Sequence, residues 1–318
     1  DRRPWPAPDW EVATPASQGV SEAGLEMLRD YFGKRGTRAA LVIRHGRIIG
    51  EWYWDSSGPT TLFPVYSVTK SVASTAVGLL ITDGKLKLEQ SAADFLPAWR
   101  GDDRKAITVR HLVTMTSGLR KKEPELFSQP DQLQFALAQP LDHKPGEFWD
   151  YNNVACNTLS GVIAAASGME MADFLQKRLY GPLGMTHLTM DKSGPSTLAY
   201  MGLHISARDL ARFGYLFLNR GRWRGKPLLP ETWVREATTT SQSLNKSYGY
   251  LWWTYAPGTT EGVPSDAYSA RGLFGNDLLV IPSQDLIVVR LIGNGTFDGS
   301  TNVNMDEYAR LALKALLD

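Results

Sequence analysis

The chain has 318 residues, of which 43% are hydrophobic and 21% charged, and its formal net charge is +1. This length allows one large domain or two closely packed domains, with enough apolar residues for a sizeable core. We expect neither a membrane span nor a nucleic-acid partner, because no stretch approaches the roughly 18 uninterrupted apolar residues of a spanning helix, and the densest basic run, Arg120 to Lys122, is followed at once by acidic residues.

The first part of the chain predicts an extended arm, a helix, a β-hairpin and a second helix. They are expected at about residues 1–16, 21–33, 39–54 and 67–84. Apolar residues recur at helical spacing in both helical segments, and Ser21 is placed to cap the first turn of the first helix. The hairpin consists of two apolar runs joined by His45-Gly46, whose glycine can adopt a positive φ.

The rest of the chain predicts a helical middle followed by strands. Residues 85–200 have mostly short helical patterns and loops marked by proline and glycine, with few strands. Ser206 and Asp209 form a predicted capping box for a helix to about Asn219. Three strands, at residues 249–255, 278–281 and 286–292, and an amphipathic helix at 305–317 follow.

This order of elements predicts an α/β fold of the α+β kind. Strands from both ends of the chain can share one antiparallel sheet flanked by helices, with the middle inserted as a mostly helical lobe. We therefore expect a discontinuous sheet domain, residues 1–66 and 205–318, and a mostly helical domain, residues 67–204. The sequence contains no internal repeat.

The first candidate site is Ser67-Val68-Thr69-Lys70. Residues three apart on a helix share one face, so the Lys70 amine can reach the Ser67 hydroxyl. A hydroxyl is a weak nucleophile until a base removes its proton, and a partly desolvated lysine can be that base. The pattern alone is weak, because Ser243 to Lys246 also matches it, within a polar loop. The alternative is that Ser67 only caps a helix.

The second candidate is Asp150-Tyr151-Asn152-Asn153, which precedes an apolar helix. A tyrosine that faces the cationic Lys70 can shuttle a proton, and a carboxamide can hydrogen-bond both the lysine and a substrate carbonyl, which suggests Tyr151 and Asn153. The alternative is an Asx-type turn that leads into the helix.

The third candidate is the stretch from Ala270 to Asn276, which includes Arg271, Gly272 and Leu273 and leads into a strand. Small residues let a ligand approach the backbone, and such a strand edge can direct an N–H group toward an oxyanion. The alternative is a tight connection with a β-bulge.

Together, the three candidates occur in the order and approximate spacing found in the serine β-lactamases, DD-peptidases and related esterases, and the chain resembles that family from about Trp10 onward. The resemblance implies a β-lactamase/transpeptidase-like fold. It also implies that Ser67 is the nucleophile, that Tyr151 assists proton transfer with the support of Lys70, and that Asn153 contacts the substrate. The backbone N–H groups of Ser67 and Leu273 would form the oxyanion hole.

The third candidate departs from the Lys-Thr-Gly of true β-lactamases. Ala270 stands in place of the lysine and Arg271 in place of the threonine, so the groups that hold a β-lactam carboxylate in the family are missing. Arg271 can replace that charge only if it points inward. The stretch from Gly272 to Asn276 instead resembles the corresponding segment of 6-aminohexanoate-dimer hydrolases, which share this fold and cleave linear amides. The helix predicted at residues 207–212 also resembles theirs.

Other kinds of site have less support. Cys156 is the only cysteine, which excludes an intramolecular disulfide, and the five histidines lack the spacing of metal ligands, so we expect no metal and no cofactor. No G-x-S-x-G motif is present. Trp252 and Trp253 can line a cleft or belong to the core. Because the numbering starts at Asp1, we expect an exported protein, periplasmic or secreted, with a cytoplasmic location as the alternative.

Three functions remain in competition. The leading hypothesis is a hydrolase of a small-molecule ester or linear amide, with an acyl-enzyme on Ser67 that water resolves. The second is a β-lactamase or DD-peptidase. The third is a catalytically silent sensor domain that only forms a slow acyl adduct. The sequence does not indicate an oligomeric state.

Overall fold

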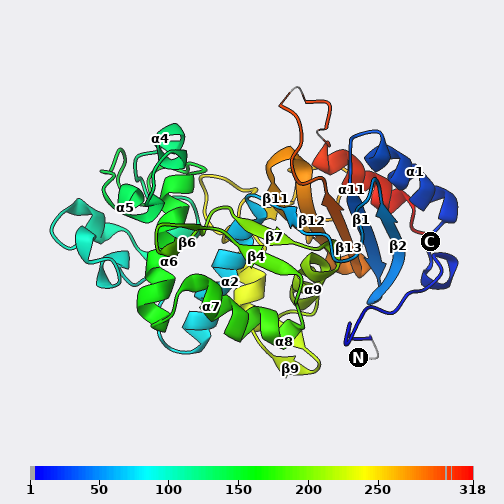
Figure 1. Ribbon diagram of the computed structural model, residues 1–318, viewed down its shortest axis with the longest axis horizontal. Helices are drawn as coiled ribbons and strands as arrows, with labels where there is room; N and C mark the ends of the chain where they lie inside the picture. The colour runs from blue at the N-terminus through cyan, green and yellow to red at the C-terminus, as the bar shows by residue number, and fades with distance from the viewer. Residues whose placement is uncertain (1–3, 298, 302, 318) are drawn as a thin grey trace.

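The computed structural model describes residues 4–297, 299–301 and 303–317. Its centre is a six-stranded sheet in the order β10-β11-β12-β13-β1-β2, in which every neighbouring pair is antiparallel. Strands from the two ends of the sequence meet where β1 pairs with β13 (Figure 1). This confirms the predicted antiparallel sheet to which both ends of the chain contribute. The strands are β1 (Ala39–Arg44), β2 (Arg47–Tyr53), β10 (Trp253–Thr254), β11 (Tyr268–Gly272), β12 (Asn276–Ile281) and β13 (Leu286–Leu291).

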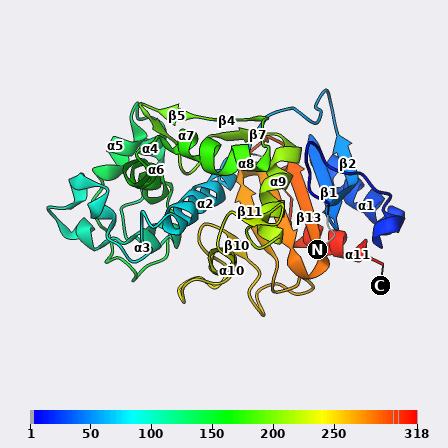
Figure 2. The ribbon, with the colours of Figure 1, turned by 90° about the horizontal axis from the view of Figure 1, so that it is seen from below.

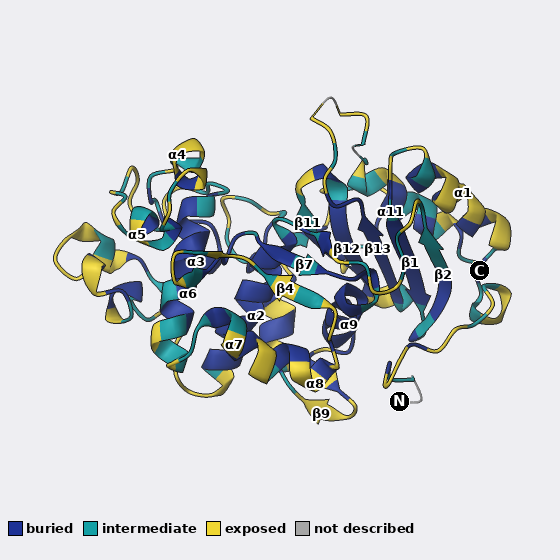
Figure 3. Ribbon diagram, viewed as in Figure 1, coloured by how far each residue is buried: buried dark blue, intermediate teal, exposed yellow. Residues whose placement is uncertain are grey.

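Helices cover both faces of the sheet. On one face α1 and α11 pack against alternate strand residues, and on the other face α2 and α9 do so, which gives two hydrophobic clusters. The central strands β12 and β13 are buried along their whole length (Figure 3). Ser21 caps α1 as expected, since its hydroxyl accepts from Gly24 N at 3.2 Å. These helices are α1 (Glu22–Gly33), α2 (Val68–Thr82), α9 (Ala207–Leu218) and α11 (Met305–Lys314).

The middle of the chain forms a helical part beside the sheet, and α2 runs between the two (Figure 2). Every residue of α2 from Val68 to Leu80 is buried, so this helix belongs to the core on all sides. The domain boundaries expected at residues 67 and 204 remain a prediction. The helices of this part are α3 (Val109–Val113), α4 (Glu123–Phe127), α5 (Gln132–Leu137), α6 (Asn153–Ser167), α7 (Met171–Leu175) and α8 (Gly181–Leu183); α10 (Glu231–Ala237) comes later in the chain.

Short strands that the sequence did not predict form three small sheets. They are β3 (Phe63–Pro64), β4 (Leu188–Met190), β5 (Lys192–Ser193), β6 (Ser196–Thr197), β7 (Leu203–Ile205), β8 (Arg222–Trp223) and β9 (Lys226–Pro227). The order β3-β7-β4 forms a three-stranded sheet, which joins the segment before α2 to the segment before α9. Runs of two or three residues are too short to show an apolar alternation. None of the described helices is long and apolar enough to cross a membrane.

The strand expected at residues 249–255 is largely wrong. Only Trp253–Thr254 forms β10, because Leu251 has a φ of +60° and Gly249 N donates to Trp252 O in a turn. A bulky residue in the left-handed region ends a strand. The aromatic run that suggested a strand instead fills the core around the turn.

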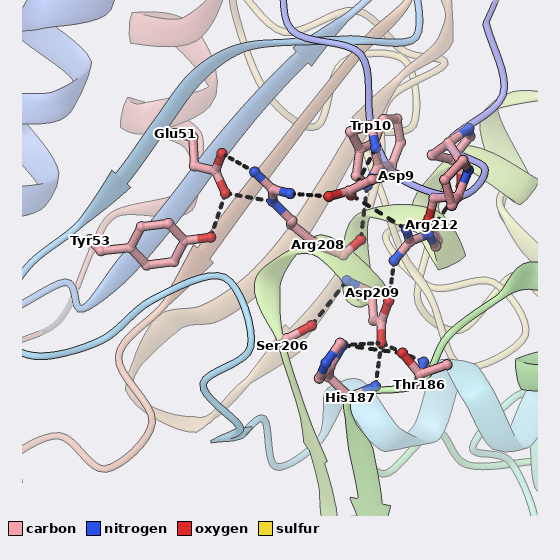
Figure 4. A network of polar contacts seen from close by, with 12 residues as sticks. Asp9, Trp10, Glu51, Tyr53, Thr186, His187, Ser206, Arg208, Asp209 and Arg212 are labelled. Carbon is pink, nitrogen blue, oxygen red and sulfur yellow. Dashed lines mark hydrogen bonds and ion pairs between the residues drawn. The ribbon is translucent and has the colours of Figure 1, made fainter.

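The capping box expected at the start of α9 is only half formed. The Ser206 hydroxyl accepts from Asp209 N at 3.3 Å, but the Asp209 carboxylate accepts from Thr186 N at 2.8 Å and His187 N at 2.7 Å (Figure 4). Asp209 also pairs with Arg212. The carboxylate therefore fastens α9 to the segment that precedes β4 instead of closing its own helix end.

The same helix holds the N-terminal arm. The indole of Trp10 donates to Arg208 O at 3.2 Å and packs edge-on against Tyr215 at 5.4 Å. Arg208 forms a two-point ion pair with Glu51 of β2, at 2.8 and 2.7 Å, and a further contact with Asp9 (Figure 4). The arm expected at residues 1–16 thus packs over the body in its described part.

Replacing Asp209 by alanine should destabilise the protein. The Asp209 side chain is 0% exposed and that of Arg212 only 7%, so the change leaves a buried cation without this partner and orphans two N–H groups. Breaking such a pair typically costs about 3–5 kcal/mol in the free energy of unfolding. Denaturant unfolding measures it, with Glu26→Ala as the control, since the Glu26 carboxylate is 56% exposed and pairs with the exposed Arg29, so its loss should cost at most about 1 kcal/mol. Equal midpoints for the two variants would contradict this expectation.

Candidate active site

Ser67 and Lys70 meet at the N-terminal end of α2. Ser67 immediately precedes the helix and makes no capping hydrogen bond with its side chain. Its Oγ instead accepts from Lys70 Nζ at 2.8 Å. The lysine is 1% exposed, and its Nζ also donates to the carbonyl oxygen of Tyr200 at 3.0 Å. The helical spacing of the motif therefore produces the predicted contact between the hydroxyl and the amine.

Aromatic rings complete the surroundings of Lys70. Its Nζ lies 4.7 Å from the ring centroid of Tyr151 and 5.6 Å from that of Tyr200. No carboxylate of the described residues lies within ion-pair distance of this amine. Burial raises the pKa of the nearby Cys156 thiol to about 12, which keeps that group protonated. Lys70 thus faces Ser67 without a competing anion.

The backbone around Ser67 is tightly constrained. Tyr66 has a φ of +49°, an uncommon value for a bulky residue. On the sheet side, a Cβ at Gly272 would lie 2.1 Å from the carbonyl oxygen of Val65. Only glycine allows this close approach, which places the end of β11 beside the segment that leads into Ser67. The two segments proposed to supply the oxyanion hole, at Ser67 and Leu273, are therefore neighbours.

The two asparagines after Tyr151 have different contacts. Asn152 caps α6, since its Oδ1 accepts from Ala155 N at 2.9 Å, and its Nδ2 donates to Leu119 O at 2.7 Å. The Asx-type turn considered above is therefore formed by Asn152. Asn153 lines the cleft, and its buried Oδ1 has no hydrogen-bond partner in the described part of the chain. The expected contact of Asn153 with Lys70 is not formed, and the Tyr200 carbonyl holds the lysine instead.

Tyr151 is held by its ring. It stacks on Trp253, with the centroids 5.7 Å apart and 27° between the planes, and meets Tyr248 edge-on at 6.2 Å. Its hydroxyl makes no hydrogen bond to Ser67 or Lys70 within the described residues. Trp252, in contrast, is 0% exposed and packs on Phe213 in the core. Trp253 therefore lines the cleft, whereas Trp252 belongs to the core.

These groups surround one cleft of about 630 Å³. Six of the seven predicted site residues line it, and the seventh, Lys70, lies buried behind Ser67. The predicted lining residues are Ser67, Tyr151, Asn153, Arg271, Gly272 and Leu273. Trp253, which the sequence suggested as a possible cleft wall, also lines it. The remaining lining residues belong to no motif and were not predicted; they are Tyr66, Glu123, Phe127, Gln132, Tyr200 and Met201.

The electrostatics of the sheet side depend on Arg271 and the strand beside it. Arg271 is opposite Asp277 in the register of β11 and β12, and Asp277 is opposite Arg290 of β13. Burial raises the pKa of Asp277 to about 7, although both arginines oppose this shift. Ala270 is buried at 1% exposure and carries no charge. The described residues contain no group of three or more side chains suited to a metal ion.

Comparisons with known proteins identify relatives of this chain. The family model described as Beta-lactamase matches residues 28–314. A 6-aminohexanoate-dimer hydrolase of Paenarthrobacter ureafaciens is 25% identical over an alignment of 320 positions, which spans 88% of this chain and 80% of that protein.

Two solved structures share the fold. A Bacillus anthracis protein provisionally assigned as a 6-aminohexanoate-dimer hydrolase superposes with a TM-score of 0.79 at 19% identity, over 98% of this chain and 88% of that one. A class C beta-lactamase mutant superposes with a TM-score of 0.73 at 19% identity, over 93% and 98% of the two chains. At these identities the likeness concerns the fold alone.

Proposed function

This chain belongs to the beta-lactamase family, and we propose that it is a serine hydrolase which cleaves a small ester or a linear amide through an acyl-enzyme on Ser67. The observation that carries the proposal is the 2.8 Å contact between Lys70 Nζ and Ser67 Oγ at a cleft lined by Tyr151 and Asn153. A nucleophile with a base at hydrogen-bond distance is the arrangement that covalent catalysis requires.

In the proposed reaction, the Ser67 hydroxyl loses its proton to the Lys70–Tyr151 pair as Oγ bonds to the substrate carbonyl carbon. The bond to the leaving alcohol or amine then breaks, and the leaving group takes up that proton. A water molecule next attacks the acyl carbon, gives its proton to the same pair, and displaces Ser67 Oγ, which is reprotonated. The N–H groups of Ser67 and Leu273 stabilise the oxyanion in both steps, and Asn153 offers its amide to the substrate.

The β-lactamase or DD-peptidase alternative has less support from the third candidate, the stretch from Ala270 to Asn276. Ala270 is buried and cannot offer a cation to a β-lactam carboxylate. Arg271 does line the cleft, but its guanidinium lies 5.5 Å from the Trp253 ring centroid, and that ring stacks on Tyr151. Arg271 thus packs against this aromatic wall, and it stands at the threonine position of the Lys-Thr-Gly motif, not at the lysine position.

We therefore expect short acyl esters to be hydrolysed faster than the cephalosporin nitrocefin. Loss of one charge-assisted contact removes about 1.5–3 kcal/mol, which corresponds to roughly a ten- to hundredfold lower kcat/KM. Initial rates on p-nitrophenyl esters, nitrocefin, a D-Ala-D-Ala peptide and a linear aminohexanoate amide test the proposal directly. Nitrocefin turnover equal to the best ester would support the β-lactamase alternative. A single acylation without turnover on any member of the panel would support the silent sensor.

A further inference from the structure

The turn after β11 contains Leu273, one of the two proposed oxyanion donors, and a buried amide holds this turn from behind. The amide belongs to Asn276, which is 0% exposed. Its Nδ2 donates to Leu273 O at 2.8 Å and to Gly293 O at 2.9 Å. Its Oδ1 accepts from Ile292 N at 3.0 Å and from Gly293 N at 2.9 Å. All four partners are main-chain groups, so the amide joins the turn to the segment that follows β13.

The backbone of this turn depends on support from outside it. Phe274 has a φ of +64° and Gly275 one of +79°. Such a φ is uncommon for a bulky residue, so local preference alone does not favour the turn. Arg290 of β13, which is also 0% exposed, donates to Phe274 O at 2.6 Å and to Gly275 O at 3.0 Å. Arg290 thus holds the far side of the turn, whereas Asn276 holds the carbonyl of the donor residue itself.

The segment that follows β13 also contacts the other half of the proposed oxyanion hole. The side chain of Asn294 accepts a hydrogen bond from the hydroxyl of Tyr66, which immediately precedes Ser67. A Cβ at Gly293 would lie 3.3 Å from Pro64 Cδ, so this segment also packs closely on β3. Residues 292–294 are therefore a common support, to which Asn276 joins one proposed donor and Tyr66 joins the other.

From this arrangement we propose that Asn276 is a positioning residue, which sets the direction of the Leu273 N–H and its separation from the Ser67 N–H. The inference rests on the proposed function and goes beyond it by assigning a role to a residue that does not line the cleft. An oxyanion hole is effective because its donors already point at the oxygen before the charge develops. Asn276 acts on the rate only through the backbone of Leu273.

A thionoester measures what the oxyanion hole contributes, because sulfur accepts hydrogen bonds more weakly than oxygen. The oxygen preference is the ratio of kcat/KM for p-nitrophenyl butyrate to kcat/KM for its thiono analogue, in which sulfur replaces the carbonyl oxygen. We expect roughly 10²–10³ for the wild type, which is the effect of one lost donor. The variant Asn276→Asp places an oxygen against the carbonyls of Leu273 and Gly293, so the turn shifts and the oxygen preference should fall by about tenfold or more.

The kinetic constants separate positioning from a general loss of structure. Acylation and deacylation both pass through an oxyanion, so kcat should fall in Asn276→Asp while KM changes little. A purely structural role would lower the rates on both esters by the same factor and leave the oxygen preference unchanged. Asn276→Ser is the second variant, because it adds no charge and its short side chain cannot bridge the two segments. It should show the same fall if Asn276→Asp does not fold.

Asn219→Asp is the matched control, because Asn219 is only 7% exposed and its Nδ2 donates to Tyr215 O at 2.8 Å at the end of α9. Its oxygen preference should equal that of the wild type, and the midpoint of denaturant unfolding shows that each variant is folded. An unchanged oxygen preference in a folded Asn276 variant would overturn the inference, as would a wild type that hydrolyses both esters at equal rates. Turnover that is lost in Ser67→Ala would leave the proposed function intact in either case.

Discussion

Replacing Ser67 by alanine is expected to abolish turnover of every substrate while leaving the fold intact. Without Oγ no acyl-enzyme can form, and removal of a nucleophile that works with its base as one unit lowers kcat by roughly 10⁴-fold or more. The change in stability should be small. The Ser67 side chain is only partly buried, does not cap α2, and makes one hydrogen bond, to Lys70. Such a bond contributes about 1 kcal/mol to the free energy of unfolding.

Mass spectrometry after treatment with a fluorophosphonate identifies the nucleophile directly. The chain contains its own control in the second S-x-x-K match, where Ser243 is exposed on a loop between α10 and β10. Ser243→Ala should retain the wild-type rate and label. A label found on Ser243, or on Ser67→Ala to the same extent as on the wild type, would show that the assignment is wrong.

The sequence predicted those helices and strands whose apolar residues recur at a regular spacing or whose ends are marked by turn residues. The terminal helices, the hairpin around His45-Gly46 and the two long C-terminal strands all show regular apolar spacing, and the structure confirms them. The strand predicted around Leu251 was wrong because the positive φ of this residue depends on surrounding contacts that no local sequence pattern contains. β11 was not predicted as a strand, since it is short and includes Ser269 and Arg271.

The site was predictable where chemistry resides in side-chain motifs and unpredictable where it resides in the backbone. Ser67 and Lys70 are three residues apart, so helix geometry alone brings them together. The group that holds Lys70 in place is the main-chain carbonyl of Tyr200, and every residue has such a group. Glu123 and Trp253 reach the cleft through packing of segments far apart in sequence, which a single sequence does not reveal.

The hydroxyl of Tyr151 is the second group on which the proposed mechanism depends. Its ring is fixed between Trp253 and the Lys70 side chain, whose Nζ lies 4.7 Å from the ring centroid. The hydroxyl has no hydrogen bond to Ser67 in the substrate-free structure. Catalytic hydrogen bonds often shorten only when substrate is bound, so this geometry is compatible with a role in proton transfer.

Replacing Tyr151 by phenylalanine is therefore expected to lower kcat by about 10²–10⁴-fold on the best substrate, with little loss of stability. The change keeps the stacking on Trp253 and the face presented to Lys70, and it removes only the proton path. Tyr248→Phe is the matched control, because Tyr248 contacts the Tyr151 ring edge-on but does not line the cleft. The Tyr248→Phe variant should keep a rate within a few-fold of the wild type. If Tyr151 served only to pack the turn before α6, both variants would retain the wild-type rate. A rate loss confined to Tyr151→Phe, together with an unchanged midpoint of denaturant unfolding, would identify the hydroxyl itself as the group that matters.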